Sequence, residues 1–285
     1  MQRNFCLGSE WLYYKIYTGV QTTDLILLEK FYPVILQLKK RKIIQKWFFI
    51  RYKDNDTHFR IRFLIENKKF LSKVIHMLYP IINDLLQENL VWKIQTDTYK
   101  RELERYGETT IENSEFLFWK DSEMMIQYLT LKKTFPKKEI PLLFSFGSID
   151  SFLNTFLLSN LEKLKLMDTL QLSFKEEFKT DKTLKKELHK KYHGFADEIE
   201  SFLSGDVENR FPDLFEIIET KRNQSLEKIL EIKTKIQIPL NAFISSHIHM
   251  MLNRQYTSKQ RMYELIIYDH LYRYYKSKNY IKKDL

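Results

Sequence analysis

The chain has 285 residues, of which 44% are hydrophobic and 15% aromatic, so it can bury a sizeable core and is not expected to be disordered. Lys and Arg residues (47) outnumber Asp and Glu residues (37), and the formal net charge of +10 favours anionic partners without choosing among them. The single cysteine, Cys6, excludes an internal disulfide and a multi-thiolate metal site, and no run of 18 apolar residues predicts a membrane span. We therefore expect a cytoplasmic protein.

The first hundred residues predict alternating strands and helices. Segments with the aromatic and β-branched content of strands lie at 11–17, 46–52, 58–65 and 91–97, and apolar residues at helical spacing fill about 23–40 and 68–87. The polar stretch KDNDT (53–57) predicts a hairpin turn between two of these strands. This order predicts a split, ferredoxin-like βαββαβ unit.

The remainder of the chain predicts mainly helices. Thr109 and Glu112 have capping-box spacing at the start of a helix that extends to about Leu131. Further helical patterns cover 213–231, 239–256 and 260–276, and the lysine-rich stretch 162–191 is expected to be a solvated helix surface or a loop between helices. No linker stands out. The predicted fold class is therefore α+β, with a ferredoxin-like unit over 1–107 and a helical region over 108–285 packed on it as one compact domain.

The stretch HFRIRF (58–63) combines strand alternation with two arginines. Alternate side chains of a strand share a face, so His58, Arg60 and Arg62 should lie opposite the three intervening apolar residues. One interpretation is a sheet whose outer face is simply solvated. The other is an anion site, because arginine offers planar, bidentate recognition of carboxylate or phosphate.

The stretch YKRELERYG (99–107) follows the last predicted strand of this unit and brings Arg105 close to the sheet. Glu102 precedes Arg105 by three residues, a spacing at which the two can pair on a helical turn. Such a pair would fix the direction of the Arg105 guanidinium. The alternative is a surface ion-pair cluster worth at most about 1 kcal/mol per pair.

The stretch SSHIHMMLNR (245–254) lies in a predicted helix and contains two histidines. The helical period puts His247 beside the apolar stripe, where it should be a packing residue, and His249 on the polar side. His249 is then either exposed or directed into a cleft. No second His or Cys stands at helical spacing on that face, and no phosphate-binding glycine motif occurs, so neither a metal site nor a cofactor is expected.

Five stretches taken in order, WLYYKIY, WFFIRYKDNDTHFRIRF, TDTYKRELERYG, SEFLFWKDSE and HMMLNR, resemble the thiopeptide-type bacteriocin biosynthesis domain. This domain is the C-terminal elimination domain of class I lantibiotic dehydratases. In that family a partner enzyme or domain uses glutamyl-tRNA to esterify Ser or Thr of a precursor peptide, and the elimination domain expels glutamate to leave dehydroalanine or dehydrobutyrine. The resemblance implies a lyase that acts on a ribosomally made precursor peptide, with glutamylation supplied by a separate protein. The sequence leaves open whether the protein forms a homodimer.

The resemblance also implies the catalytic residues. The arginine pair of the family's H-x-R-x-R motif falls on Arg60 and Arg62, the E-x-x-R-Y-G motif supplies Glu102 and Arg105, and the histidine before M-x-x-N-R falls on His249. The arginines would hold the leaving glutamate, while the histidine would move the proton. We expect these groups to converge on one cleft between the sheet unit and the C-terminal helices.

Two alternative functions remain open from the sequence. The first is a pyridine-forming thiopeptide cyclase of the same family, which would need no glutamate pocket. The second is a non-catalytic peptide- or RNA-binding module, which the net charge permits but which the aromatic residues, placed mostly at core positions, do not favour. One departure from the family pattern is Glu108, which stands where a second glycine usually follows R-Y-G.

Overall fold

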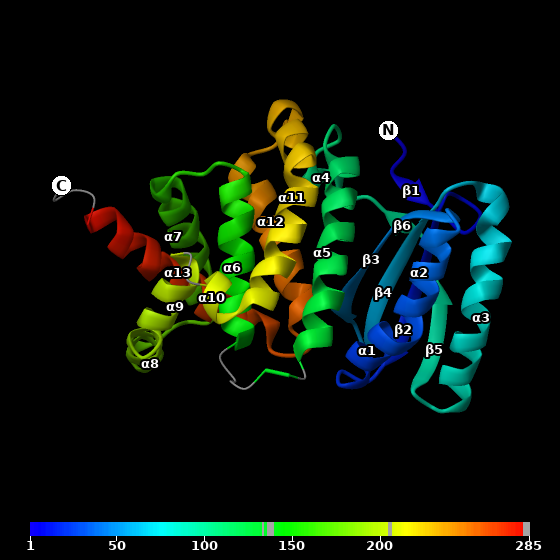
Figure 1. The fold of residues 1–285 in the computed structure, drawn as a ribbon, viewed down its shortest axis with the longest axis horizontal. Coiled ribbons are helices and arrows are strands. Elements are labelled where there is room, and N and C mark those ends of the chain that lie inside the picture. Colours follow the sequence, from blue (N-terminus) through cyan, green and yellow to red (C-terminus); the bar gives the residue numbers. More distant parts are fainter. Residues whose placement is uncertain (133, 136–139, 205–206, 282–285) are drawn as a thin grey trace. The chain divides into compact units, whose positions relative to one another are not determined.

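The computed structural model describes residues 1–132, 134–135, 140–204 and 207–281. It has an antiparallel sheet near the N-terminus and helices throughout the C-terminal half, so the predicted α+β class is confirmed (Figure 1). The chain divides into two compact units. Unit 1 comprises Met1–Lys133, Lys235–Ile238 and Asn253–Ser258, and unit 2 comprises Thr134–Thr234, Pro239–Leu252 and Lys259–Leu285. The predicted division of the chain at residue 107 stays a prediction.

Unit 1 is built on a four-stranded antiparallel sheet with the strand order β3-β4-β2-β5. The strands are β2 (Trp11–Thr18), β3 (Ile44–Lys53), β4 (Thr57–Ile65) and β5 (Val91–Thr96). The helical segments are α1 (Thr22–Leu25), a π-helix (Ile26–Phe31), α2 (Tyr32–Lys40), a 3₁₀ turn (Lys68–Phe70) and α3 (Leu71–Gln87). The strands and helices predicted for the first hundred residues are therefore present. The ferredoxin-like description of the unit stays a prediction.

One face of the sheet is apolar and forms the core of unit 1. Phe59, Ile61 and Phe63 alternate along β4 and are completely buried, and the ring of Phe31 meets that of Phe59 edge-on at 5.6 Å. Burial of each such side chain stabilises the fold by about 1.5–3 kcal/mol. A slip of one residue would turn these side chains to the opposite face, so their burial fixes the register of β4.

A second, two-stranded sheet ties the N-terminus to the segment that follows β5. In it β1 (Asn4–Phe5) pairs with β6 (Tyr99–Lys100), which α4 (Leu103–Tyr106) and α5 (Ile111–Lys132) follow. Directly after β6, Arg101 donates from Nε and Nη2 to the two carboxylate oxygens of Glu115 in α5, each over 2.7 Å. Both side chains are buried. This bidentate ion pair holds the segment against α5.

All regular secondary structure described for unit 2 is helical. Its helices are α6 (Ile140–Thr155), α7 (Asn160–Glu177), α8 (Lys182–His193), α9 (Ala196–Leu203), α10 (Val207–Arg210), α11 (Pro212–Lys235), α12 (Leu240–Gln255) and α13 (Gln260–Ile281). The last residues of α11 and α12 belong to unit 1. The three predicted helices over 213–231, 239–256 and 260–276 are confirmed, and the lysine-rich stretch forms α7 and α8. Asp181 caps α8 by accepting a hydrogen bond from the Leu184 amide at 2.8 Å.

Packing between α7 and α13 combines an aromatic contact with buried charge. The rings of Phe174 and Tyr268 meet edge-on at 5.1 Å. Next to them the buried Asp269 accepts from Lys175 at 2.5 Å and from Arg273 at 2.7 Å. None of the helices described here combines the length and the hydrophobicity that crossing a membrane requires.

Replacing Glu115 by alanine should lower the free energy of unfolding of unit 1 by about 3–5 kcal/mol, because it leaves the buried Arg101 guanidinium without its carboxylate. All four tryptophans lie in unit 1, so urea unfolding followed by tryptophan fluorescence reports on this unit. Glu112→Ala is the control, since Glu112 is 63% exposed and 3.6 Å from Arg101 and should cost less than about 1 kcal/mol. Equal losses for the two variants would contradict the structural role of the Arg101–Glu115 pair.

Candidate functional site

The polar face of β4 carries His58, Arg60 and Arg62 together. The Arg60 Nε donates to Nε2 of His58 at 3.1 Å, and the Arg60 guanidinium lies 3.4 Å from the centre of the Tyr52 ring. In the sheet register Arg62 lies opposite Tyr13 of β2. The two arginines therefore stand on the face opposite the apolar core, as the strand alternation predicted.

His58 is buried and has a defined orientation. Its Nδ1 lies 3.1 Å from the carbonyl oxygen of Asp56, and its Nε2 faces Arg60. Burial lowers the pKa of His58; the hydrogen bond to Asp56 opposes this shift and the charge of Arg60 adds to it. A neutral imidazole with its proton on Nδ1 satisfies both contacts, because it donates to Asp56 and accepts from Arg60.

Arg62 is a buried guanidinium surrounded by aromatic rings. It is 7% exposed, and its central carbon lies 4.3, 5.0 and 5.2 Å from the ring centres of Tyr13, Tyr99 and Phe48. Within the described residues its Nε has no hydrogen-bond partner and no carboxylate lies within ion-pair distance. Burial lowers its pKa. Each cation–π contact stabilises the charge by about 0.5–2 kcal/mol, but the donors of the guanidinium still lack an anionic acceptor.

The predicted ion pair of the YKRELERYG segment is present. The Nε of Arg105 lies 3.1 Å from Oε2 of Glu102, and the two side chains are 57% and 59% exposed. Gly107 ends α4 with φ of +74°, and a Cβ at this position would come within 2.6 Å of the Thr110 hydroxyl. Glycine is therefore required here. At this exposure the pair contributes little stability, and its effect is to limit the directions that Arg105 can take.

Two of the predicted residues, Glu102 and Arg105, influence the ionisation of Tyr106. This tyrosine is buried, and burial raises its pKa; Glu102 raises the pKa further, whereas Arg254 and Arg105 lower it. The charge of Arg62 in turn lowers the pKa of Arg254. Within unit 1, Arg254 thus interacts electrostatically both with Tyr106, which Glu102 and Arg105 also influence, and with Arg62.

Asn253 and Arg254 are the residues that the sequence analysis missed. Arg254 is completely buried, with Nη1 3.8 Å from a carboxylate oxygen of Asp121. Asn253 exchanges two hydrogen bonds, each of 2.9 Å, with the backbone of Arg51 in β3. The sequence did contain a signal for these two residues. They end the motif HMMLNR, which begins with His249, and they directly follow an apolar helical pattern.

His249 lies in unit 2 and is oriented by a buried carboxylate. Its Nδ1 is 2.6 Å from Oε1 of Glu264 in α13, and Arg261 donates to the other oxygen of Glu264 at 3.0 Å. Glu264 is completely buried, while the His249 side chain is 33% exposed. A carboxylate at Nδ1 favours the tautomer with its proton there, which leaves Nε2 as a proton acceptor. His247, by contrast, is buried against Phe243 at 4.5 Å between ring centres, as expected of a packing residue.

The predicted site residues are divided between the two units. Arg60, Arg62, Glu102 and Arg105 belong to unit 1, and His249 belongs to unit 2, so their convergence on one cleft stays a prediction. In the part of the chain that the structure describes, no three His, Cys, Asp or Glu side chains are grouped as metal ligands.

The sequence matches a known family over most of its length. The family model described as "Lantibiotic biosynthesis dehydratase C-term" matches residues 11–275. Among curated proteins, the chain is 27% identical over 270 residues to the subtilin biosynthesis protein SpaB of Bacillus subtilis. That match covers 90% of this chain and 25% of SpaB. The chain therefore spans about a quarter of the length of this relative.

Solved structures share the fold. The tRNA-dependent lantibiotic dehydratase MibB from Microbispora sp. 107891 matches with a TM-score of 0.78 at 17% identity, over 98% of this chain and 29% of MibB. The pyridine synthase TbtD from thiomuracin biosynthesis matches with a TM-score of 0.64 at 11% identity, over 94% of this chain and 100% of TbtD. TsrL matches with a TM-score of 0.63 at 11% identity, over 95% of each chain. At these identities the matches describe the fold alone.

Replacing His58 by glutamine should reduce the loss of stability of unit 1 in mild acid. The pKa of His58 is lower in the folded chain, so the unfolded chain binds more protons once the pH falls below about 6.5. The stability contributed by neutral His58 is present above that pH and is lost as the pH falls towards the folded pKa. Glutamine keeps a donor and an acceptor but does not titrate. Between about pH 7.5 and 5.5 the urea midpoint should fall further for the unsubstituted chain than for His58→Gln.

The exposed His76 of α3 provides the matched control for this measurement. His76→Gln should follow the unsubstituted chain at both pH values. A pH dependence that is the same in His58→Gln as in His76→Gln would show that His58 is not the titrating group.

Proposed function

Since the chain belongs to the family of lantibiotic biosynthesis dehydratase C-terminal regions, we propose that it eliminates glutamate from glutamylated Ser and Thr residues of a precursor peptide. The products are dehydroalanine and dehydrobutyrine. Because the chain spans only about a quarter of SpaB, the proposal assigns the preceding glutamyl-tRNA-dependent esterification to a separate protein or region. The setting is the biosynthesis of a lanthipeptide or thiopeptide-type antibiotic.

The observation that carries the proposal is that Arg62 is buried without a carboxylate partner among the described residues. Its guanidinium is buried among three aromatic rings, and no carboxylate of the described residues forms an ion pair with it. Removing such a charge from water costs several kcal/mol, and an anionic ligand with planar oxygens would offset that cost through bidentate hydrogen bonds. The glutamyl group carries one carboxylate and generates a second as it leaves.

The chemistry follows from these charges. A base removes the Cα proton of the esterified residue, the electron pair forms the Cα–Cβ double bond, and the Cβ–O bond breaks to release glutamate. Negative charge develops first on the peptide carbonyl and then on the leaving carboxylate. Arg60, Arg62 and Arg105 are proposed to stabilise this charge, and the buried Arg62 offers donors that are already fixed in a water-poor environment and need no reorganisation during the reaction. Glu102 keeps Arg105 in position through their 3.1 Å ion pair.

His249 is proposed to transfer the proton. Its Nδ1 faces the buried carboxylate of Glu264 at 2.6 Å, so Nε2 is the nitrogen left to accept a proton from substrate. Glu264 acts as a positioning residue. It would fix the tautomer of the imidazole and stabilise the imidazolium once the proton has arrived.

The cyclase alternative is kept because TbtD, a pyridine synthase, has the same fold. That likeness does not discriminate between the two reactions. Retention of all five residues of the elimination motifs favours elimination, because a cyclase acting on dehydroalanines would have no glutamate to hold.

Replacing Arg62 by alanine should slow glutamate release by about 10²–10³-fold, the usual cost of losing a preorganised donor to developing charge. The substrate is a synthetic peptide with a glutamyl ester on serine, and the readouts are released glutamate and peptide mass. Arg62→Lys should not restore the rate, because an ammonium cannot reproduce the planar fork. Arg41→Ala, which removes an exposed arginine after α2, is the control and should keep the full rate.

Two results would overturn the assignment. Undiminished glutamate release by Arg105→Ala or His249→Ala would remove those residues from the mechanism. Consumption of a peptide that carries dehydroalanines, with no reaction of the glutamylated peptide, would make the chain a cyclase.

Replacing Glu264 by glutamine should lower kcat by about 10²-fold while leaving KM nearly unchanged, because the imidazole loses its orienting carboxylate but the substrate contacts remain. Glu177→Gln is the matched control. Glu177 also binds Arg261, but it is 45% exposed and does not contact His249. If both variants lose kcat equally, the network around Arg261 is structural and Glu264 has no specific role in proton transfer.

A further inference from the structure

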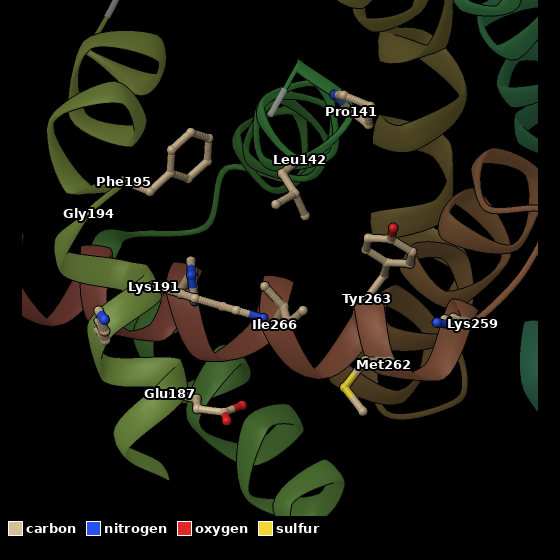
Figure 2. A pocket seen from close by; sticks show the side chains of 12 residues that line it. Pro141, Leu142, Glu187, Lys191, Gly194, Phe195, Lys259, Met262, Tyr263 and Ile266 are labelled. Atoms are coloured by element: carbon tan, nitrogen blue, oxygen red, sulfur yellow. The ribbon is translucent and has the colours of Figure 1, made fainter. Parts of the chain in front are cut away.

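Two features of the described residues stand outside the proposed chemistry. In unit 2 a pocket of about 790 Å³ lies between α6, α8 and α13, and the apolar Leu142 and the exposed Lys191 and Lys259 are among the residues that line it (Figure 2). In unit 1 the buried His58 contacts Arg60, which the proposed mechanism uses, but has itself no role there. Because both nitrogens of the His58 ring have an identified partner, this side chain supports an inference about the reaction.

Arg60 is held by two neighbours. Its Nε donates to Nε2 of His58 at 3.1 Å, and its guanidinium lies 3.4 Å from the centre of the Tyr52 ring. The aromatic contact keeps the guanidinium on one side of the ring, and the hydrogen bond fixes the direction of the Nε–H group. Among the residues that the structure describes, no hydrogen bond or ion pair engages the two Nη groups of Arg60.

This arrangement determines which edge of Arg60 can meet an anion. A guanidinium pairs with a carboxylate through two parallel N–H groups of its planar fork. Since His58 occupies Nε, the pair that remains on Arg60 consists of the two Nη groups. Arg62 differs, because its Nε has no hydrogen-bond partner within the described residues. The two arginines of β4 therefore present different edges to a ligand.

His58 is itself held from three directions. Its ring lies opposite Tyr17 of β2 and Tyr52 of β3 in the sheet register, with ring centres 4.6 and 5.4 Å away. Its Nδ1 lies 3.1 Å from the carbonyl oxygen of Asp56, and its side chain is completely buried. A rotation of the ring would give up both of its hydrogen bonds. The ring thus offers Arg60 a fixed acceptor.

We propose that His58 is a positioning residue, whose neutral imidazole holds Arg60 in the orientation that receives the glutamyl carboxylate and whose protonation releases it. The proposal rests on the proposed function for the identity of the anion. Protonation would place a proton on Nε2 and set two cationic donors against each other at 3.1 Å, so the hydrogen bond would be lost. His58 would act through Arg60 and would not touch the substrate.

The charges around His58 determine the pH at which the contact is lost. Charged and titratable groups of the surrounding strands and of the hairpin turn are Lys15 and Tyr17 of β2, Tyr52 of β3, Asp54 and Asp56 of the turn, and Lys93 and Asp97 in and after β5. Burial, Arg60 and Lys15 lower the pKa of His58, whereas the hydrogen bond to Asp56 and the charge of Asp54, 3.8 Å away, raise it. The net pKa lies below the usual value of about 6.5. The contact is therefore present at neutral pH and is lost as the pH falls through this lowered pKa.

Nuclear magnetic resonance with ¹⁵N-labelled histidine tests the contact without a substrate. The His58 signals are identified by their absence in His58→Gln. At pH 7.5 the ring should carry its proton on Nδ1 and none on Nε2. Arg60→Ala should raise the pKa of His58 because it removes a neighbouring positive charge, whereas Arg41→Ala, at an exposed position after α2, should not. A proton on Nε2, or the same pKa in both variants, would overturn the proposal.

Glutamate release from the glutamylated peptide tests the positioning role. His58→Leu removes the acceptor and should slow release by about 10–10²-fold, the cost of misplacing a catalytic group by about 1 Å. In a chain that already carries Arg60→Ala, the same substitution should have no further effect, because His58 acts through Arg60. Equal losses with and without Arg60 would make His58 a purely structural residue. Circular dichroism verifies that each variant is folded.

His58→Gln is the conservative variant, since its side-chain oxygen can accept from Arg60 but does not titrate. At pH 7.5 it should release glutamate about fivefold or more faster than His58→Leu, the worth of one neutral hydrogen bond. Between pH 7.5 and 5.5 its rate should fall less than that of His76→Gln, the matched control at an exposed position of α3. The same fall in both variants would contradict a release of Arg60 by protonation of His58.

The outcomes separate this inference from the proposed function. If the unsubstituted chain releases no glutamate, the elimination proposal is overturned, while the ring tautomer and the effect of Arg60→Ala still decide whether His58 holds Arg60. Glutamate release with a His58 effect that is independent of Arg60 would overturn the positioning role alone.

Discussion

The interior of unit 1 is governed by the cost of burying guanidinium groups. Arg51, Arg62 and Arg254 are each less than a tenth exposed, and burial lowers the pKa of all three. Arg51 is matched by Asp24 at 2.5 Å, and Arg254 by Asp121 at 3.8 Å. Arg62 has aromatic rings in place of a carboxylate. The buried Arg62 therefore carries a positive charge that no carboxylate of the described residues pairs with.

The rest of unit 1 serves to hold these groups in place. The apolar face of β4 anchors the strand so that its arginines project to the other side. The buried Arg101–Glu115 pair fixes the segment that supplies Tyr99 to Arg62 and Tyr106 to Arg254. Asn253 pairs with the backbone of β3 beside Arg51. The contacts that stabilise unit 1 thus also position its buried arginines.

Unit 2 arranges polar groups by helix face. On α13 a buried carboxylate orients His249, and a separate face lines an apolar pocket with a cationic rim. The two features use different sides of α13, because Glu264 and the pocket-lining Met262, Tyr263 and Ile266 are separated by the helical turn.

The sequence by itself determined local features that depend on spacing. Strand alternation in HFRIRF put both arginines on one face, helical spacing made His247 a packing residue, and the three-residue interval produced the Glu102–Arg105 pair. The motif order also led to the family. These features could be predicted because each depends on residues within one turn of helix or one strand.

Only the tertiary structure decided which of these groups are buried and what they contact. The sequence treats Arg62 and Arg105 alike, yet Arg62 is buried by rings from β2, β3 and β6 while Arg105 is more than half exposed. Arg254 interacts electrostatically with Arg62, and Glu264 reaches His249, between elements far apart in the chain. Burial and charge pairing depend on packing between distant segments, and a periodic pattern contains no information about which segments will meet.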